Sequence, residues 1–150
     1  MAIEAGVLEE FHKMLDHPKK AVRKEICWSI SNVTAGNPTQ IQKCIDIGII
    51  ANLIQHMHQD SHDIRKEAVW AVSNATSQAT PEQFKYFVQA GMLQALGTVL
   101  DFQDPKTLTV SLEGINFILK AGQTDGGDNP YAMVCEESGV MDKIEGLQFH

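Results

Sequence analysis

The sequence repeats itself with a period of about 42 residues, and this period limits the fold more than any other feature. Four short segments consist of a glycine and two apolar residues, and their glycines lie 42, 43 and 48 residues apart. These glycines are Gly6, Gly48, Gly91 and Gly139. Residues 23–32 match residues 65–74 with the same offset of 42, and residues 108–117 form a degenerate third copy. Units of this length need neighbours to bury their apolar faces, so we expect them to stack into a solenoid.

Each repeat carries the signals of three helical segments. A proline preceded by asparagine or threonine, shortly before the next repeat glycine, predicts a short first helix. These prolines are Pro38, Pro81 and Pro130. After the glycine, apolar residues recur at +2, +5 and +9, which predicts an amphipathic second helix, and a longer third segment follows a polar connector. No segment alternates with period two, so we predict an all-α, right-handed superhelical solenoid with three helices per repeat, the pattern of armadillo and HEAT arrays.

The repeats divide the chain into four units. We expect residues 1–36 to form a partial repeat without most of its first helix, and residues 37–79 and 80–122 to form two further repeats. Residues 123–150 then form a partial fourth repeat, which begins with a polar, glycine-rich insert at residues 123–129 that we expect to be a mobile loop. Both ends fall inside a repeat, so we expect a piece of a longer array, whose uncapped ends favour self-association.

Composition and charge exclude several classes of protein. With 43% hydrophobic residues in 150, the chain can bury a core, and no apolar run reaches the roughly 20 residues of a membrane span. The formal net charge of −7 disfavours nucleic acid and favours a basic peptide or protein as partner, although acidic residues also simply keep a protein soluble. Three cysteines without a C-x-x-C motif, Cys27, Cys44 and Cys135, indicate reduced apolar residues in a cytosolic or nuclear protein.

Two Trp and Asn pairs, Trp28 with Asn32 and Trp70 with Asn74, recur at the same place in consecutive third helices. Their spacing places an indole and an amide one turn apart on one helix face, so stacked repeats present them as a ladder. An Asn amide can donate to and accept from a peptide backbone, and a Trp face holds the side chain of Lys or Arg. The alternative is that each Trp lies in the core and each Asn is a cap or a solvated residue. Because the pair occurs twice at one offset, we favour the peptide-binding interpretation.

Acidic residues accompany both tryptophans. Glu25 and Glu67 each lie three residues before a Trp on the same helix face, where a carboxylate can receive the cationic end of a bound Lys or Arg.

Residues 24–37 and 66–74 closely resemble the armadillo repeats of importin alpha (karyopherin alpha), the adaptor for nuclear localisation signals. Residues 111–115 and 142–148 resemble the family's degenerate ninth repeat and its tenth. The resemblance implies that the chain corresponds to about repeats seven to nine and part of the tenth. It also implies a concave groove that supplies much of the family's minor site for basic signals.

The resemblance carries functional roles onto individual residues. It implies that Trp28 and Trp70 are walls for basic side chains, that Asn32 and Asn74 clamp the peptide backbone, that Ser31 and Lys24 line the same site, and that Glu67, with Glu25 as its counterpart, is an acidic partner. The third repeat departs from the pattern, because Glu113 takes the place of Trp and Phe117 takes the place of Asn. We therefore expect the ladder to end after two rungs.

The family also implies partners and a location. Basic nuclear localisation signals and cargo proteins are the expected ligands, importin beta binds through an amino-terminal segment that this chain lacks, and an export receptor can bind at the carboxy-terminal repeats. Such an adaptor shuttles between cytoplasm and nucleus. The alternative is a protein–protein docking module of the same array with little peptide binding of its own. The two differ in their dependence on the Trp and Asn ladder.

Other candidate sites are weaker. His56, His58 and His62 lack a specific zinc spacing, and a basic cluster at residues 19–24 is expected to be solvated. The sequence contains no phosphate-binding loop, nucleophile elbow or catalytic triad motif, so we expect no enzyme activity, no cofactor and no bound metal.

Overall fold

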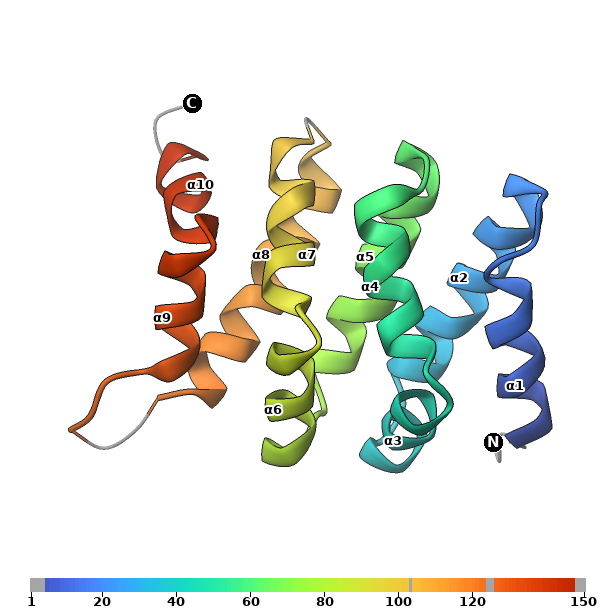
Figure 1. Cartoon of the computed structure of the whole chain (residues 1–150), viewed down its shortest axis with the longest axis horizontal. Coiled ribbons are helices and arrows are strands. Elements are labelled where there is room, and N and C mark those ends of the chain that lie inside the picture. The colour runs from blue at the N-terminus through green and yellow to red at the C-terminus, as the bar shows by residue number, and fades with distance from the viewer. Residues whose placement is uncertain (1–4, 103, 124–125, 148–150) are drawn as a thin grey trace.

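The computed structural model describes residues 5–102, 104–123 and 126–147, and these residues form helices and connectors without a β-strand (Figure 1). The prediction of an all-α fold is confirmed. The helices are α1 (Ala5–Met14), α2 (Lys20–Thr34), α3 (Pro38–Ile47), α4 (Ile49–Gln59), α5 (His62–Thr76), α6 (Pro81–Gln89), α7 (Met92–Thr98), the 3-10 helix η1 (Val99–Asp101), α8 (Pro105–Ala121), α9 (Pro130–Glu137) and α10 (Val140–Leu147). No described helix is both long and apolar enough to span a bilayer.

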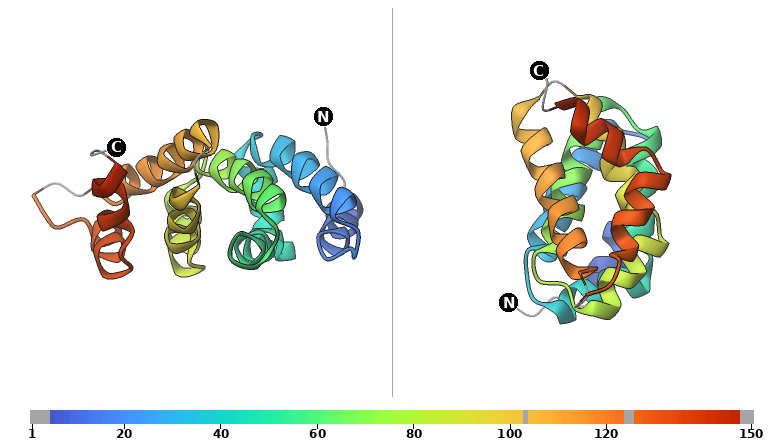
Figure 2. Two further views of the ribbon diagram at one scale, coloured as in Figure 1. Left: turned by 90° about the horizontal axis from the view of Figure 1, so that it is seen from above. Right: turned by 90° about the vertical axis from the view of Figure 1, so that its left-hand side faces the viewer.

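The helices form two layers. Helices α2, α5 and α8 lie along one layer, and the shorter helices of each unit lie along the other (Figure 2, left). Helix α5 packs against both α2 and α8, and it also packs against α4 of its own unit. Each unit therefore contributes one long helix to a continuous row, which places equivalent residues of successive repeats side by side.

The starts of the short first helices are fixed by local capping. In α3, the Asn37 side chain accepts a hydrogen bond from the Gln40 amide at 3.0 Å, while the Gln40 side chain accepts one from the Asn37 amide at 3.3 Å. Thr80 and Gln83 form the same reciprocal pair at the start of α6. These capping boxes satisfy backbone N–H groups that a helix start otherwise leaves unpaired. Both helices begin at the predicted proline.

Three of the four repeat glycines have a left-handed backbone conformation. Gly48, Gly91 and Gly139 have φ angles of 100°, 91° and 81°, a left-handed conformation that lets the chain turn between the first and second helices. Gly6 has no positive φ, and α1 passes through it from Ala5. The residues before Ala5 lie outside the described part of the chain.

The insert before α9 is only partly described. Residues 124 and 125 of the predicted loop lie outside the described residues, and those around them are not helical. Helix α9 begins at Pro130, and the Asn129 side chain accepts hydrogen bonds from the amides of Tyr131 and Ala132 at 3.0 and 3.3 Å. The same side chain donates to the Leu119 carbonyl of α8 at 2.7 Å, so it links the end of one repeat to the start of the next.

Small and hydroxyl-bearing residues bring the long helices close together. Thr34 donates to the Ala71 carbonyl at 2.7 Å, and Ser73 donates to the Val110 carbonyl at 2.8 Å, so each long helix is hydrogen-bonded to the next. A Cβ atom at Gly114 would lie 2.9 Å from the Ser73 hydroxyl oxygen, closer than real Cβ contacts allow. The distance between neighbouring long helices therefore depends on buried hydroxyl groups that are hydrogen-bonded across the contact, and on small residues where a larger side chain would not fit.

An arginine at a repeated position ties each unit to the next. Arg23 forms a bidentate ion pair with Asp60, with both N···O distances at 3.0 Å. Arg65, 42 residues later, donates to the Met57 carbonyl at 2.7 Å and to the Thr98 carbonyl at 3.4 Å, and its guanidinium carbon lies 4.7 Å from the centroid of the Phe102 ring. Both arginines therefore bridge the carboxy-terminal ends of second helices.

Candidate functional site

The exposed faces of α2, α5 and α8 form a continuous surface that carries the predicted ladder. We call the stripe of predicted site residues on the first two of these helices the ladder face; it consists of Lys24, Glu25, Trp28 and Asn32 of α2 and Glu67, Trp70 and Asn74 of α5. Trp28 is 58% exposed and Trp70 is 40% exposed, so the structure places neither indole in the core. Most other large apolar side chains of the described residues are buried, and the two tryptophans are thus exposed in an otherwise well-packed array.

A pocket of about 440 Å³ lies beside Trp28 on the ladder face. It is lined by Ala21, Lys24, Glu25 and Trp28 of α2, together with Glu67 of the neighbouring helix α5. Among the described residues, no cation forms an ion pair with either glutamate. The fold thus brings two carboxylates from different repeats into one pocket with the indole, an arrangement that suits a cationic side chain with an aliphatic stem. Lys24 adds a donor for an acceptor group of the ligand.

The two ladder asparagines differ in their hydrogen bonding. Asn32 is exposed, and its side-chain amide makes no hydrogen bond to another described residue. The Asn74 amide donates to the Ser31 carbonyl of α2 at 3.0 Å, and the Ser31 hydroxyl donates to the Trp28 carbonyl at 2.6 Å. Asn74 therefore keeps its carbonyl oxygen and one N–H for a ligand, while the Ser31 hydroxyl is already engaged. Sequence reasoning missed this division of roles, because it depends on how closely α5 packs against α2.

A second pocket, of about 330 Å³, lies beside Trp70. Helix α8 supplies its other lining residues, which are Pro105, Lys106, Thr109, Val110 and Glu113. The sequence predicts that the ladder ends after two rungs, and the structure places Glu113, which stands at the Trp position of the third repeat, in the same pocket as Trp70. The offset of 43 residues between Trp70 and Glu113 aligns the two positions in neighbouring repeats, but the sequence alone does not show that their side chains share a pocket.

The carboxyl groups with lowered pKa values lie at the starts of third helices. Burial alone would raise the pKa of Asp60, but hydrogen bonds from Arg23, the Ser61 amide and His56 outweigh it and lower the pKa. A hydrogen bond from Lys20 lowers the pKa of Asp63. Both carboxylates take part in contacts between repeats or within connectors. The carboxyl groups with lowered pKa values are therefore not the ones on the ladder face.

The same effect occurs at the start of α8. Hydrogen bonds from the side chain and amide of Thr107, together with nearby Lys66, lower the pKa of Asp104 against the opposing effect of burial. Lys66 lies 3.4 Å from an Asp104 carboxylate oxygen and so links α5 to the cap of the next long helix.

The cysteines are free and buried, as the sequence predicted. Burial raises the pKa of Cys27 to about 12 and the pKa values of Cys44 and Cys135 to about 11. A thiol with such a pKa is almost entirely protonated near neutral pH, and these buried side chains fill the core.

The histidines near the end of α4 do not converge. His56 contacts Asp60 at 2.8 Å and Asp16 at 3.1 Å, while the His62 ring stacks on Phe102 with centroids 4.0 Å apart. Within the described part of the chain, no group of His, Cys, Asp or Glu side chains has the arrangement of a metal site.

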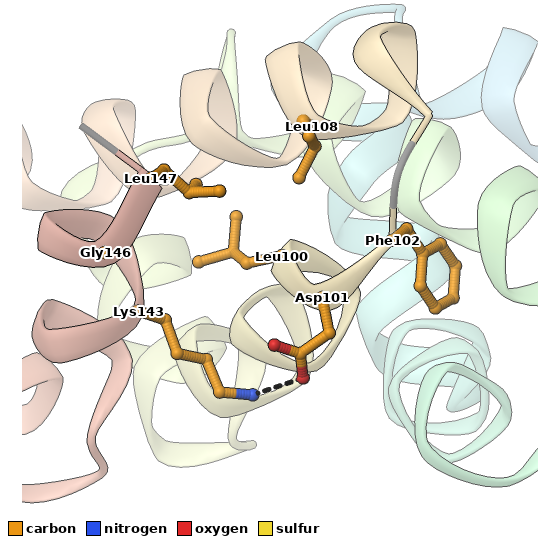
Figure 3. Close-up of a pocket in the computed structure, with 7 residues that line it drawn as sticks. All are labelled: Leu100, Asp101, Phe102, Leu108, Lys143, Gly146 and Leu147. Atoms are coloured by element: carbon orange, nitrogen blue, oxygen red, sulfur yellow. Dashed lines mark hydrogen bonds and ion pairs between the residues drawn. The ribbon is translucent and has the colours of Figure 1, made fainter. Parts of the chain in front are cut away.

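A larger cavity, of about 570 Å³, lies away from the ladder at the junction of η1, α8 and α10 (Figure 3). Leu108 lines it at the repeat position that Arg23 and Arg65 occupy in the earlier units. Lys143 of α10 donates to the Gly97 carbonyl at 3.3 Å and forms a 2.9 Å ion pair with Asp101 at the cavity mouth. A lysine from the following unit thus makes contacts of the kind that the arginines make in the earlier units.

Comparisons with known proteins agree with this architecture. Residues 1–35 match the family model of the Armadillo/beta-catenin-like repeat. The chain is 46% identical over 138 residues to importin subunit alpha-4 of Arabidopsis thaliana, and 44% identical over 137 residues to importin subunit alpha-1a of Oryza sativa subsp. japonica. Each alignment covers 88% of this chain and 26% of the relative. The chain is an armadillo array that resembles importin alpha subunits. It spans about a quarter of the length of these relatives.

Solved structures show the same fold as this armadillo array. It superposes on a designed armadillo repeat protein in complex with the peptide (KR)4 with a TM-score of 0.83 and 33% identity, over 97% of this chain and 58% of that one. A second designed armadillo repeat protein gives a TM-score of 0.82 and 30% identity, over 95% of this chain and 57% of the other. The predicted armadillo solenoid and the resemblance to importin alpha are both confirmed.

Proposed function

We propose that this armadillo array is a non-enzymatic adaptor of nuclear import whose ladder face binds basic peptides of the nuclear localisation signal type. The observation that carries the proposal is the pocket in which Glu25 and Glu67, from successive repeats, flank the exposed indole of Trp28. The names of the relatives support an import role, and the designed protein of similar fold was solved with a peptide of alternating Lys and Arg.

The ladder offers a binding mode that matches an extended peptide. Neighbouring long helices in such arrays lie about 8 to 10 Å apart, and an extended chain advances about 3.3 Å per residue, so one rung serves about three ligand residues. At each rung the indole covers an aliphatic stem, with a cation–π contact of about 0.5 to 2 kcal/mol, and the carboxylates receive the cation. The free carbonyl oxygen of Asn74 and the amide of Asn32 bond the ligand backbone without reading its sequence.

The charge of the chain supports the same ligand class. The net charge of −7 attracts basic peptides over a distance and repels nucleic acid. In this proposal the array shuttles between cytoplasm and nucleus with basic cargo proteins, and an export receptor is a further partner. Binding by the array alone is expected to be weak, because only two complete rungs contribute.

Titration of a fluorescein-labelled (KR)4 peptide, followed by fluorescence anisotropy, tests the proposal. The wild type should bind with an affinity that falls as salt rises, and the double variant Trp28→Ala/Trp70→Ala should lose at least tenfold in affinity while its helical circular dichroism is unchanged. Met133→Ala is the matched control, because this side chain is 50% exposed on α9, outside the ladder face.

A second pair of variants separates charge from packing. Glu25→Gln/Glu67→Gln should weaken binding and reduce its salt dependence, whereas the exposed Glu137→Gln on α9 should change neither. Absence of binding by the wild type, or equal binding by the tryptophan variant, would leave the array as a docking module for folded partners instead.

A further inference from the structure

The third long helix carries an exposed aromatic side chain where the first two carry the ladder asparagines. Phe117 aligns with Asn32 and Asn74 in the repeats, and it is 38% exposed on α8. It does not belong to the apolar residues packed against the core. Trp28, Trp70 and Phe117 are thus large apolar side chains exposed on successive long helices of one row.

The position of Phe117 on α8 follows the stripe of the ladder face. Exposed or partly exposed side chains recur every three or four residues at Lys106, Thr109, Glu113, Phe117 and Lys120. The first three of them line the pocket beside Trp70, and Phe117 follows one turn later. The ladder face therefore continues along α8 and does not stop at α5.

The chemistry of the ladder face changes along the row. Three of the five residues that line the pocket beside Trp28 are charged, namely Lys24, Glu25 and Glu67. The pocket beside Trp70 includes Trp70, Pro105 and Val110, with Glu113 as its single acid and Lys106 as its single base. Lys120 adds a further positive charge one turn beyond Phe117. The α2 end thus suits a cation, and the α8 end suits an apolar group.

Phe117 also changes what the third rung can bond. A phenyl ring has neither donor nor acceptor, so this rung cannot clamp a peptide backbone as an Asn amide does. A half-exposed ring gains free energy when an apolar side chain covers it, and covering about 40 Å² of apolar surface corresponds to about a fivefold gain in affinity.

From these observations we infer that Phe117, together with the Trp70 and Val110 pocket, is a specificity subsite for a large apolar residue that flanks the basic run of the bound peptide. This inference rests on the proposed function, because it needs the basic run to be held at the Trp28 rung, next to the Trp70 pocket. The array then selects composite peptides, basic at the α2 end and apolar at the α8 end.

A set of labelled peptides with one shared basic run tests the inference. One peptide has Ser at both flanks, a second has Leu at the amino-terminal flank, a third has Leu at the carboxy-terminal flank, and two further peptides carry Arg in place of each Leu. The wild type should bind one of the Leu peptides about fivefold more tightly than the Ser peptide and more tightly than either Arg peptide. The peptides carry Leu at one flank or the other because the direction in which the peptide runs across the helices is not known in advance. Whichever way it runs, one of the two Leu residues then lies at the α8 end.

Phe117→Asn restores the residue type of the first two rungs and should remove the preference for Leu while the Ser peptide binds at least as well as to the wild type. Met133→Asn, on α9, should keep the preference. The inference is overturned if the wild type shows no preference for Leu, if Phe117→Asn retains it, or if Arg is preferred at the same flank. Binding of the Ser peptide without any preference would overturn this inference alone, whereas no binding of any peptide would overturn the proposed function and the inference with it.

Discussion

Two ion pairs join α2 to the next unit, and they differ mainly in burial. The Arg23 guanidinium contacts both Asp60 oxygens at 3.0 Å, and the two side chains are 18% and 8% exposed. Arg23 also donates to the His17 carbonyl at 2.8 Å. Lys20 and Asp63 lie 3.3 Å apart, but their side chains are 53% and 54% exposed. This pair of contacts allows one substitution to serve as the control for the other.

The variant Arg23→Met keeps the aliphatic stem and removes the guanidinium. It leaves the Asp60 carboxylate shielded from water without its cation, and it breaks two charge-assisted hydrogen bonds that each contribute about 1.5 to 3 kcal/mol. We expect a loss of about 3 kcal/mol, the lower end of the range for a broken buried pair, because the contact lies near the surface. For a protein of this size the melting temperature should fall by about 6 to 12 °C.

Lys20→Met removes the exposed ion pair from the same helix and should have little effect, because solvent screens such pairs and their ordering costs entropy. Thermal and urea unfolding of both variants, followed by circular dichroism at 222 nm, measures the difference. Equal midpoints for Arg23→Met and Lys20→Met, with native helicity in both, would refute the reasoning that burial of the pair determines its contribution.

Three further predictions concern packing, thiol reactivity and pH. Gly114→Ala should destabilise the fold by about 1 to 3 kcal/mol, because the new Cβ would lie 2.9 Å from a serine hydroxyl oxygen of α5. Gly146→Ala, with open space around the new Cβ, should not lower the midpoint of urea unfolding. Equal losses in the two variants would contradict this packing argument. The Cys27 thiol, with its pKa raised to about 12 by burial, should react with a thiol reagent at pH 8 only after urea unfolding, and rapid labelling of the native chain would be inconsistent with this burial. Hydrogen bonding, led by Arg23, holds the pKa of Asp60 below its unfolded value, so the ionised carboxylate stabilises the fold above about pH 4 and this stabilisation is lost as the pH falls through the folded-state pKa. Urea midpoints measured from pH 7 to 3 should therefore decline less steeply in Arg23→Met than in the wild type. Parallel declines would show that the Arg23 and Asp60 pair does not cause the acid sensitivity.

The sequence by itself determined the period, the helical content and the starts of the short first helices. The signals at Asn37 and Pro38 are local, because a cap and a fixed φ act within one turn, and α3 begins where they predict. The left-handed turn at Gly48 is local in the same sense, since only glycine adopts it without strain. A pattern read along one helix also predicted that each Trp shares a face with the Asn four residues later, and both indoles are exposed.

Tertiary structure alone decided which side chains meet across repeats. The pairing of the Asn74 amide with the Ser31 carbonyl, and the placement of Glu113 in the pocket of Trp70, depend on the distance and tilt between neighbouring long helices. Those quantities are set by packing of side chains from three helices at once, and no short window of sequence contains them. The cavity beside Leu108 has the same origin, because its lining residues come from η1, α8 and α10 and meet only when these elements pack together. Local rules thus specify the units, and contacts between units specify the site.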